Sequence, residues 1–346
     1  MLLKLSLDKT GGLFTEMARD RTLYLPVKRG GQADFAPWTP EAEVCLDYLN
    51  TARSIKDFFL PQTENIAAFK REGKKITITP THEEPSPFVV FGARACDVRS
   101  LDVLDRVFLS DPVDTFYKAQ RENGVIVSMA CAEPEETCFC NAFGIDAAEP
   151  RGDVVTWIAG NFLYWEAKTP AGEALTGKLE TLMSEADSSD LKEIEEQGKA
   201  ARAAFKELPL GKLSLEGWSG DDLLGKFTSP LWEKMSKSCL GCGTCTYVCP
   251  TCQCYDIQDF DTGHGIARFR CWDSCMYSDF TLMAHGNPRK SQLERFRQRF
   301  MHKLVYYPAN NDGMYSCVGC GRCVAKCPIS MNIAKVIKAL GGNANA

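Results

Sequence analysis

The chain has no long hydrophobic segment among its 346 residues. A membrane-spanning helix needs about 20 consecutive apolar residues, and charged residues interrupt every apolar run well before that length. Residues 1–14 also lack the profile of a secretion or transit signal, because Lys4, Asp8 and Lys9 interrupt the leucines. We therefore expect a cytoplasmic protein, in a reducing compartment, with no membrane span.

Nucleotide-binding motifs are missing too. No Gly-x-Gly-x-x-Gly turn opens a helix, and there is no phosphate-binding loop. No nucleophile–base–orienter pattern stands out, so no substrate site is evident on this chain and its status as an enzyme is left open. The mild net charge of −5 argues against nucleic acid as the main partner.

Cysteine, by contrast, is abundant. The 17 cysteines are odd in number and gathered in short runs, which argues against a disulfide framework. Two runs share one spacing: Cys239-x2-Cys242-x2-Cys245-x3-Cys249-Pro250 and Cys317-x2-Cys320-x2-Cys323-x3-Cys327-Pro328. This is the spacing of bacterial ferredoxins that bind two [4Fe–4S] clusters, where the fourth cysteine of each run ligates the other run's cluster. Structural zinc sites use separated Cys-x2-Cys pairs instead.

The spacing therefore predicts two clusters with exchanged fourth ligands. The first is predicted on Cys239, Cys242, Cys245 and Cys327, and the second on Cys317, Cys320, Cys323 and Cys249. Glycines inside both runs leave room for backbone N–H groups to approach the cluster sulfides, and such hydrogen bonds influence the reduction potential. The chain is thus expected to carry electrons.

Four further cysteines predict a third centre: Cys96, Cys131, Cys138 and Cys140. Cys96 and Cys131 each follow a β-rich apolar run, and the carboxyl ends of parallel strands meet at the sheet edge where ligands bind. Cys138 and Cys140 can complete a set of four thiolates, for a zinc ion or a third [4Fe–4S] cluster, with Asp97 as a substitute oxygen ligand. The alternative is a set of buried, redox-idle thiols.

Other polar groups allow more than one interpretation. Cys252, Cys254, Cys271 and Cys275 either form a fourth metal site or pack beside the clusters, and Cys45 is expected in the core. The basic stretch 289–303 either docks an acidic partner, offsets the charge of an anionic cluster or is simply solvated. No two histidines have the spacing of metal ligands.

The chain divides into three parts of an α+β protein. Residues 1–170 are expected to form a mixed α/β domain, with strands at 22–27, 75–79, 88–92, 124–129, 154–158 and 162–167 and a helix at 97–109. Residues 171–230 are expected to form a helical or linker segment, in which the polar stretch 171–208 is either two helices or a partly mobile linker. Residues 231–346 are expected to form a mainly helical dicluster ferredoxin domain, with helices at 289–304 and at 331–340, the latter ending at Gly341-Gly342.

Several segments together resemble a known family: FGARACDVRSLDVLDRVF, CAEPEETCFCNAFG, CPTCQCYDIQD, RCWDSCMYSDFTLMAHGNPR, RFRQRFMHK and CVGCGRCVAKCP. They are similar to the iron–sulfur beta subunit of cytosolic sulfhydrogenases, to the A subunit of anaerobic sulfite reductase, and to the iron–sulfur subunit of flavin oxidoreductase complexes linked to heterodisulfide reductase. The resemblance covers residues 58–333. One departure is Ala284-His285-Gly286-Asn287-Pro288-Arg289, where the family more often has Gly-His-Asn-Pro-Arg.

The resemblance implies an electron-transfer subunit of an anaerobic oxidoreductase complex. Such chains relay electrons between a subunit that binds FAD and NAD(P)H and a catalytic subunit, which is a hydrogenase, a heterodisulfide reductase or a sulfite reductase. It also supports the eight dicluster cysteines and favours a third cluster on Cys96, Cys131, Cys138 and Cys140. The alternatives are a redox enzyme whose active site is this N-terminal centre, and a cluster-based redox sensor.

Overall fold

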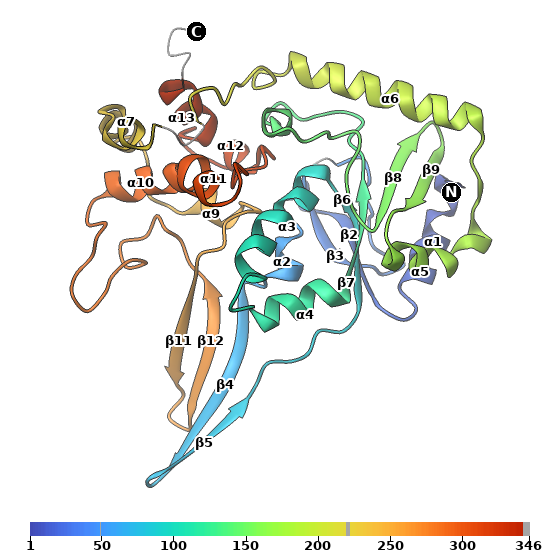
Figure 1. The fold of residues 1–346 in the computed structure, drawn as a ribbon. Helices are drawn as coiled ribbons and strands as arrows, with labels where there is room; N and C mark the ends of the chain where they lie inside the picture. Colours follow the sequence, from blue (N-terminus) through green and yellow to red (C-terminus); the bar gives the residue numbers. More distant parts are fainter. Residues whose placement is uncertain (49, 219–221, 342–346) are drawn as a thin grey trace.

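The computed structural model describes residues 1–48, 50–218 and 222–341, which form two lobes (Figure 1). The first lobe is built on an eight-stranded sheet of order β10-β1-β9-β8-β7-β6-β2-β3. Its strands are β1 (Leu2–Ser6), β2 (Thr22–Arg29), β3 (Gln32–Pro37), β6 (Phe88–Ala93), β7 (Gly124–Met129), β8 (Val154–Ala159), β9 (Phe162–Ala167) and β10 (Ser184–Glu185). Strands β2, β6, β7 and β8 run parallel, and the other pairings are antiparallel.

Both faces of this sheet are covered, which explains its continuous apolar strands. In β6, Val89 and Phe91 join the core beneath α1 (Thr10–Met17) and α5 (Pro170–Gly177). Phe88 and Val90 point to the other face, as alternate strand residues must, and join a second core. Helices α2 (Lys56–Phe59), α3 (Ala95–Phe108) and α4 (Thr115–Asn123) contribute to that second core.

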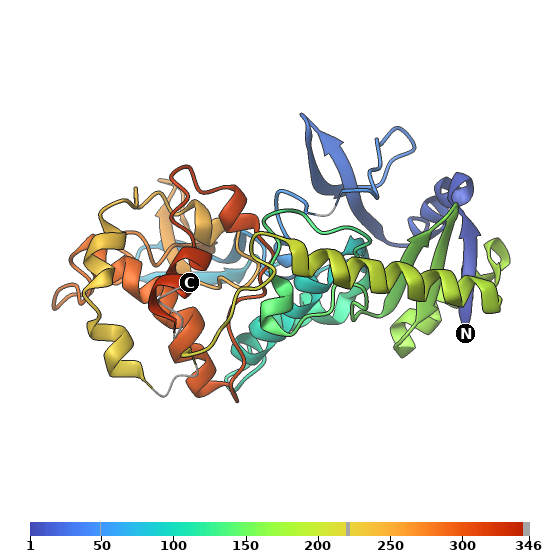
Figure 2. The same ribbon diagram turned by 90° about the horizontal axis from the view of Figure 1, so that it is seen from above.

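The stretch 171–208 contains most of α5, which packs on the sheet of the first lobe, and α6 (Ser188–Glu207). Asp187 caps α6 by accepting from the Asp190 N–H, while the Asp190 carboxylate accepts from the Asp187 N–H, a reciprocal capping box. Helix α6 then runs along the first lobe toward the second (Figure 2).

The second lobe is mainly helical. Its helices are α7 (Leu223–Thr228), α8 (Leu231–Ser236), α9 (Thr244–Tyr247), α10 (Gln292–Met301), a π-helical turn (His302–Tyr306), α11 (Tyr307–Asn310), α12 (Arg322–Ala325) and α13 (Ile333–Leu340). Helix α10 begins later than expected because Ser291 and Glu294 form a capping box. Asn332 likewise caps α13. The predicted helix end at Gly342 lies outside the described residues.

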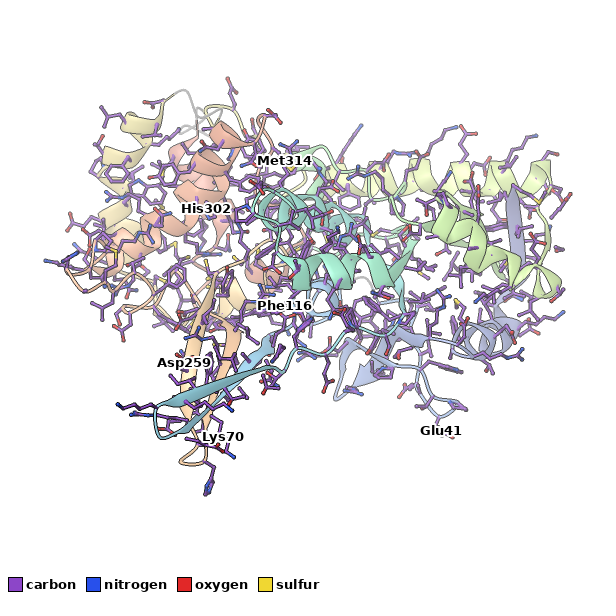
Figure 3. The ribbon with its side chains drawn as sticks, turned by 60° about the horizontal axis from the view of Figure 1, so that its bottom comes forward. Glu41, Lys70, Phe116, Asp259, His302 and Met314 are labelled. Atoms are coloured by element: carbon purple, nitrogen blue, oxygen red, sulfur yellow. The ribbon has the colours of Figure 1, made fainter. Side chains whose placement is uncertain are left out.

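A four-stranded sheet joins the two lobes and projects from the body (Figure 1). Its order is β11-β12-β4-β5, with β4 (Thr63–Glu72), β5 (Lys75–Pro80), β11 (Tyr255–Asp261) and β12 (Ile266–Trp272). Lys70 and Asp259 mark its outer part in Figure 3. Near the body, the buried Arg270 pairs with Glu64 across β12 and β4. The expected domains at 1–170 and 231–346 are therefore connected by strand pairing as well as by the chain.

None of the helices in the described ranges combines the length and apolar character required to cross a membrane.

Candidate metal centres

The two cysteine runs have the same local backbone. Gly243 and Gly321 adopt φ of 74° and 79° and stand immediately before the short helices α9 and α12. This left-handed conformation is readily available only to glycine. Helices α9 and α12 pack against each other, so the two runs face one another as related halves.

Cys249 of the first run lies beside the second run. Burial raises the pKa of Cys317 to about 12, and the nearby Cys249 thiolate adds to the rise. Cys249 also acts electrostatically on Cys320 and Cys323, whose pKa values burial likewise raises. The structure thus brings together the four cysteines of the second predicted set.

The Cys249 thiol itself is stabilised as a thiolate. A hydrogen bond with Cys252 lowers its pKa, as do Lys303 and the Thr251 hydroxyl. Lys303 Nζ donates to Cys249 Sγ at 3.4 Å, and Thr251 Oγ1 lies 3.2 Å from the same sulfur. Since the thiolate is the form that binds metal, this environment prepares Cys249 for ligation.

The first run gathers at the surface of the second lobe. Burial raises the pKa of Cys245, and Cys239 is among its charged neighbours. The Gly241 N–H donates to Cys239 Sγ at 3.4 Å, the kind of N–H···S bond that cluster sites use. Cys242 is exposed. Cys327 follows α12, in the position equivalent to Cys249, and its thiol lies 3.6 Å from the Met331 carbonyl oxygen.

Two buried cations lie among these thiols. Burial works to lower the pKa of Arg299 and of Lys303, but the surrounding cysteine thiolates outweigh it and raise both pKa values. Arg299 Nε has no hydrogen-bond partner among the described residues. Buried charge requires compensation, so four-thiolate clusters, which are anionic, fit this environment. These two residues of the basic stretch therefore turn inward, as the charge-offset interpretation expects.

The four N-terminal cysteines come together in the first lobe. Cys96, Cys131, Cys138 and Cys140 line one small cavity. Cys96 is the second residue of α3, which follows β6, and Cys131 follows β7, so both lie at the same edge of the parallel sheet as expected. Burial raises the pKa of Cys138 to about 12, with Cys131 among the causes. Asn50 Nδ2 donates to Cys138 Sγ at 3.5 Å. Four converging thiols are a suitable donor set for a cluster.

Asp97 is placed differently from the expectation. Its Oδ1 and Oδ2 atoms accept from Arg322 Nη1 and Nη2 at 2.6 and 3.1 Å. Both carboxylate oxygens are thus engaged by a guanidinium in this structure, and the role of Asp97 as a substitute ligand stays a prediction. Arg322 sits between Cys320 and Cys323, so the pair links the third set to the second run.

The third set and the second run share a wall. Cys320 and Gly319 also line the cavity of the four N-terminal thiols. The Phe139 N–H donates to the Gly319 carbonyl at 2.9 Å. A Cβ atom on Gly319 would lie 2.4 Å from the Phe139 carbonyl oxygen, so glycine permits this close approach.

The other cysteines are divided between two places. Cys252 is a close neighbour of Cys249, and Cys254 of Cys275, beside the cysteines of the two runs. Cys271 instead has Asp256 and Asp273 as its charged neighbours. The four-cysteine fourth site is therefore not formed, in agreement with the packing alternative. Cys45 is buried, as predicted.

A single ion needs a tighter arrangement than a cluster does. Within the described residues, no three or more His, Cys, Asp or Glu side chains are placed to hold a metal ion. A cubane spreads its four thiolates around a cube, whereas zinc draws its ligands to about 2.3 Å from one point.

Two buried cations near the centres were not predicted. Lys56 Nζ donates to the carbonyls of Cys249 and Cys252 at 3.0 and 3.1 Å and lies 3.5 Å from the centre of the Trp272 ring. Arg94 donates to the carbonyls of Leu46, Tyr48 and Ala130. Neither Lys56 nor Arg94 lies within one of the two cysteine runs. The only signal for Arg94 is its place two residues before Cys96.

Comparison with known proteins supports an iron–sulfur protein of the dicluster type. A family model described as a 4Fe-4S dicluster domain matches residues 238–331, which contain both cysteine runs. The chain is similar to "Sulfhydrogenase 2 subunit beta" of Pyrococcus furiosus, with 32% identity over 326 residues, covering 94% of this chain and 93% of that protein. No solved structure matches the chain. The chain therefore belongs to the family of sulfhydrogenase beta subunits, and it is an iron–sulfur electron-transfer subunit.

Proposed function

We propose that this chain is a relay of three [4Fe–4S] clusters in a cytoplasmic, anaerobic oxidoreductase complex. Electrons pass between a subunit that binds FAD and NAD(P)H and a catalytic subunit such as a hydrogenase, a heterodisulfide reductase or a sulfite reductase. The third cluster is held by Cys96, Cys131, Cys138 and Cys140. The other two follow the exchanged ligand sets of the dicluster runs. The clusters supply the redox chemistry, and the protein sets their spacing, potential and docking surfaces.

One observation carries this proposal: Cys320 lines the cavity of the four N-terminal thiols. The second cluster would therefore adjoin the third directly. Cys249, in the first run, lies beside Cys317, Cys320 and Cys323, which couples the second cluster to the first. Electron tunnelling weakens steeply with distance, so an uninterrupted series of neighbouring thiol sites favours a relay from one lobe to the other.

The first run supplies the exposed end of the relay. Cys242 is exposed, and Leu240 beside it is 64% exposed. The loop that carries Leu282 and Met283, which are 61% and 59% exposed, starts near Tyr277, whose hydroxyl donates to the Cys242 carbonyl. Exposed apolar side chains in segments tied to one site are candidates for a protein interface. A partner subunit docks here.

The test is iron and sulfide analysis together with activity of the isolated chain. Anaerobically reconstituted protein should contain about 12 irons for three cubanes, rather than about 8 for two. Without partner subunits, it should not oxidise NAD(P)H with an artificial electron acceptor. Rapid NAD(P)H oxidation by the chain alone contradicts the relay.

A second candidate is an enzyme whose active site is the N-terminal centre. It is favoured by a cavity of about 610 Å³ over the carboxyl ends of β7 and β8, lined by Met129, Ala130, Ala132 and Ile158. Cys131 lies between two of these residues in the sequence, although the four N-terminal thiols line the separate small cavity and not this one. A catalytic metal site keeps an open coordination position, so this candidate requires a small molecule that changes the spectrum of the third centre alone. A relay predicts no such change.

A further inference from the structure

Cys254 and Cys275 meet at the root of the β11–β12 hairpin. Tyr255 pairs with Trp272 at the start of the ladder. One step further, the Asp273 N–H donates to the Cys254 carbonyl at 2.9 Å. The ladder thus brings the two chain segments together, and the Cys254 and Cys275 thiols are near enough to influence each other's pKa.

This pair lies between the two predicted cluster sites without belonging to either. Cys275 is an electrostatic neighbour of Cys245 in the first run. Cys254 is a neighbour of Cys252, which is hydrogen-bonded to Cys249. Lys303 acts on both members of the pair.

We propose that Cys254 and Cys275 form a redox-active dithiol that exchanges electrons with the neighbouring clusters. On oxidation the two S–H bonds break, one S–S bond forms, and two protons and two electrons leave. The electrons pass one at a time to two oxidised [4Fe–4S] clusters, each of which is reduced by one electron. The protons go to solvent. Reduction reverses every step.

The chemistry of the pair suits this role. Disulfide formation needs a thiolate and a second sulfur within reach. Loss of the first of the two protons leaves the Cys254 thiolate, which the Cys275 S–H and the Lys303 ammonium both stabilise. As part of the relay, which is the proposed function on which this role rests, the pair stores two electrons beside centres that carry one each. In the oxidised form it also links the strands at the base of the projecting sheet.

The test is a thiol titration of the full-length, iron-loaded chain under anaerobic conditions. The protein is equilibrated in mixtures of reduced and oxidised dithiothreitol, quenched in acid and alkylated, and its peptides are analysed by mass spectrometry. We expect Cys254 and Cys275 to lose alkylation together at one buffer ratio and to appear as one disulfide-linked peptide pair. In Cys254→Ser, Cys275 should stay alkylated throughout.

Cys271→Ser is the matched control, because Cys271 lies in the same hairpin with carboxylates rather than thiols as its charged neighbours. This variant should titrate like the parent chain. Full alkylation of Cys254 and Cys275 at every buffer ratio, in protein that retains its iron and visible absorption, overturns the dithiol and leaves the relay intact. Pairing of either cysteine with Cys252 overturns it too. Both of these outcomes are measured on the parent chain, so the test stands even if a variant fails to fold.

Discussion

Arg322 and Asp97 form an ion pair that is buried between the two lobes, with side chains only 2% and 1% exposed. Arg322 also donates from Nε to the Thr51 carbonyl at 2.9 Å. Removal of one partner of a buried pair leaves an uncompensated charge in a medium of low dielectric constant. The pair therefore positions the second run against the N-terminal cysteines.

We predict that Arg322→Met destabilises the chain by about 3–5 kcal/mol, because Asp97 is left buried and unpaired. Chemical denaturation measures the change. The double variant Arg322→Met/Asp97→Leu should recover much of the loss, since an apolar pair needs no charge compensation. Arg268→Ala, which breaks an exposed pair with Asp259, should have little effect. Equal losses in the single and double variants would argue against this explanation.

Lys303 should raise the reduction potential of the second cluster. Its Nζ donates to Cys249 Sγ, Thr251 Oγ1 and the Ser316 carbonyl, and a nearby positive charge favours the more negative, reduced form. Lys303→Met is therefore expected to lower that potential by on the order of 50–100 mV. An anaerobic redox titration followed by electron paramagnetic resonance measures it. Lys290→Met, an exposed cation of the same stretch, is the control, and an unchanged potential in Lys303→Met contradicts the prediction.

The third centre should be separable from the dicluster. Cys138→Ala/Cys140→Ala removes two of its four thiols, so iron content should fall from about 12 to about 8 per chain. The dicluster signals should persist, because their eight cysteines are untouched. Cys45→Ala, in which a buried thiol away from the centres is removed, should keep all its iron. Loss of every cluster signal in the double variant would instead indicate collapse of the whole fold.

Much of the first lobe could be predicted because its strands are buried on both faces. Phe88–Ala93 and Gly124–Met129 are continuous apolar runs, and they were located to within one residue. Strands β1, β3, β4, β10, β11 and β12 were missed. β11 is exposed along its whole length, so burial of one face does not define it, and its pairing with β12 depends on tertiary contacts.

The site was predictable to the extent that ligands repeat in sequence. That the second predicted set and the N-terminal cysteines come together follows from cysteine spacing and from parallel-strand geometry, while their role as ligands stays a prediction. The roles of Arg299, Lys303 and Arg322 could not be predicted from the sequence, because a basic side chain in a helix gives the same sequence pattern whether it faces solvent or a thiol. Their burial emerges only when the lobes pack.

His302 should make stability dependent on pH. Burial lowers its pKa from 6.5 to about 4, and Lys303 and Arg289 act in the same direction. Between about pH 4 and pH 6.5 the unfolded chain therefore binds more protons than the folded chain. The contribution of the buried, neutral His302 to the free energy of unfolding is complete above about pH 6.5 and is lost as pH falls toward 4. It amounts to about 3 kcal/mol. His302→Phe should flatten the fall in unfolding temperature between about pH 7 and pH 5, whereas His285→Gln, at an exposed site, should not.

The surface around Cys242 should control electron transfer to one partner subunit. Leu282 and Met283 are exposed in the loop whose two ends are held by the run: Tyr277 donates to the Cys242 carbonyl, and Gln292 donates to the Cys239 carbonyl. Met283→Glu places a charge where an apolar contact is proposed. It should weaken assembly of the complex by about tenfold, the usual effect of losing one well-packed interface residue. Iron content should not change, because no ligand is altered.

Ile78→Glu provides the matched control for this surface, since Ile78 is equally exposed, at 61%, but lies on the projecting sheet. Assembly is measured by titrating the co-expressed partner subunits against each variant, and electron transfer by the rate at which the clusters are reduced through the complex. If the Met283→Glu variant assembles with its partners and has its clusters reduced at the parent rate, while the Ile78→Glu variant does not, the partner docks on the projecting sheet instead. Cys242 would then be the exposed end of a relay whose exit lies elsewhere.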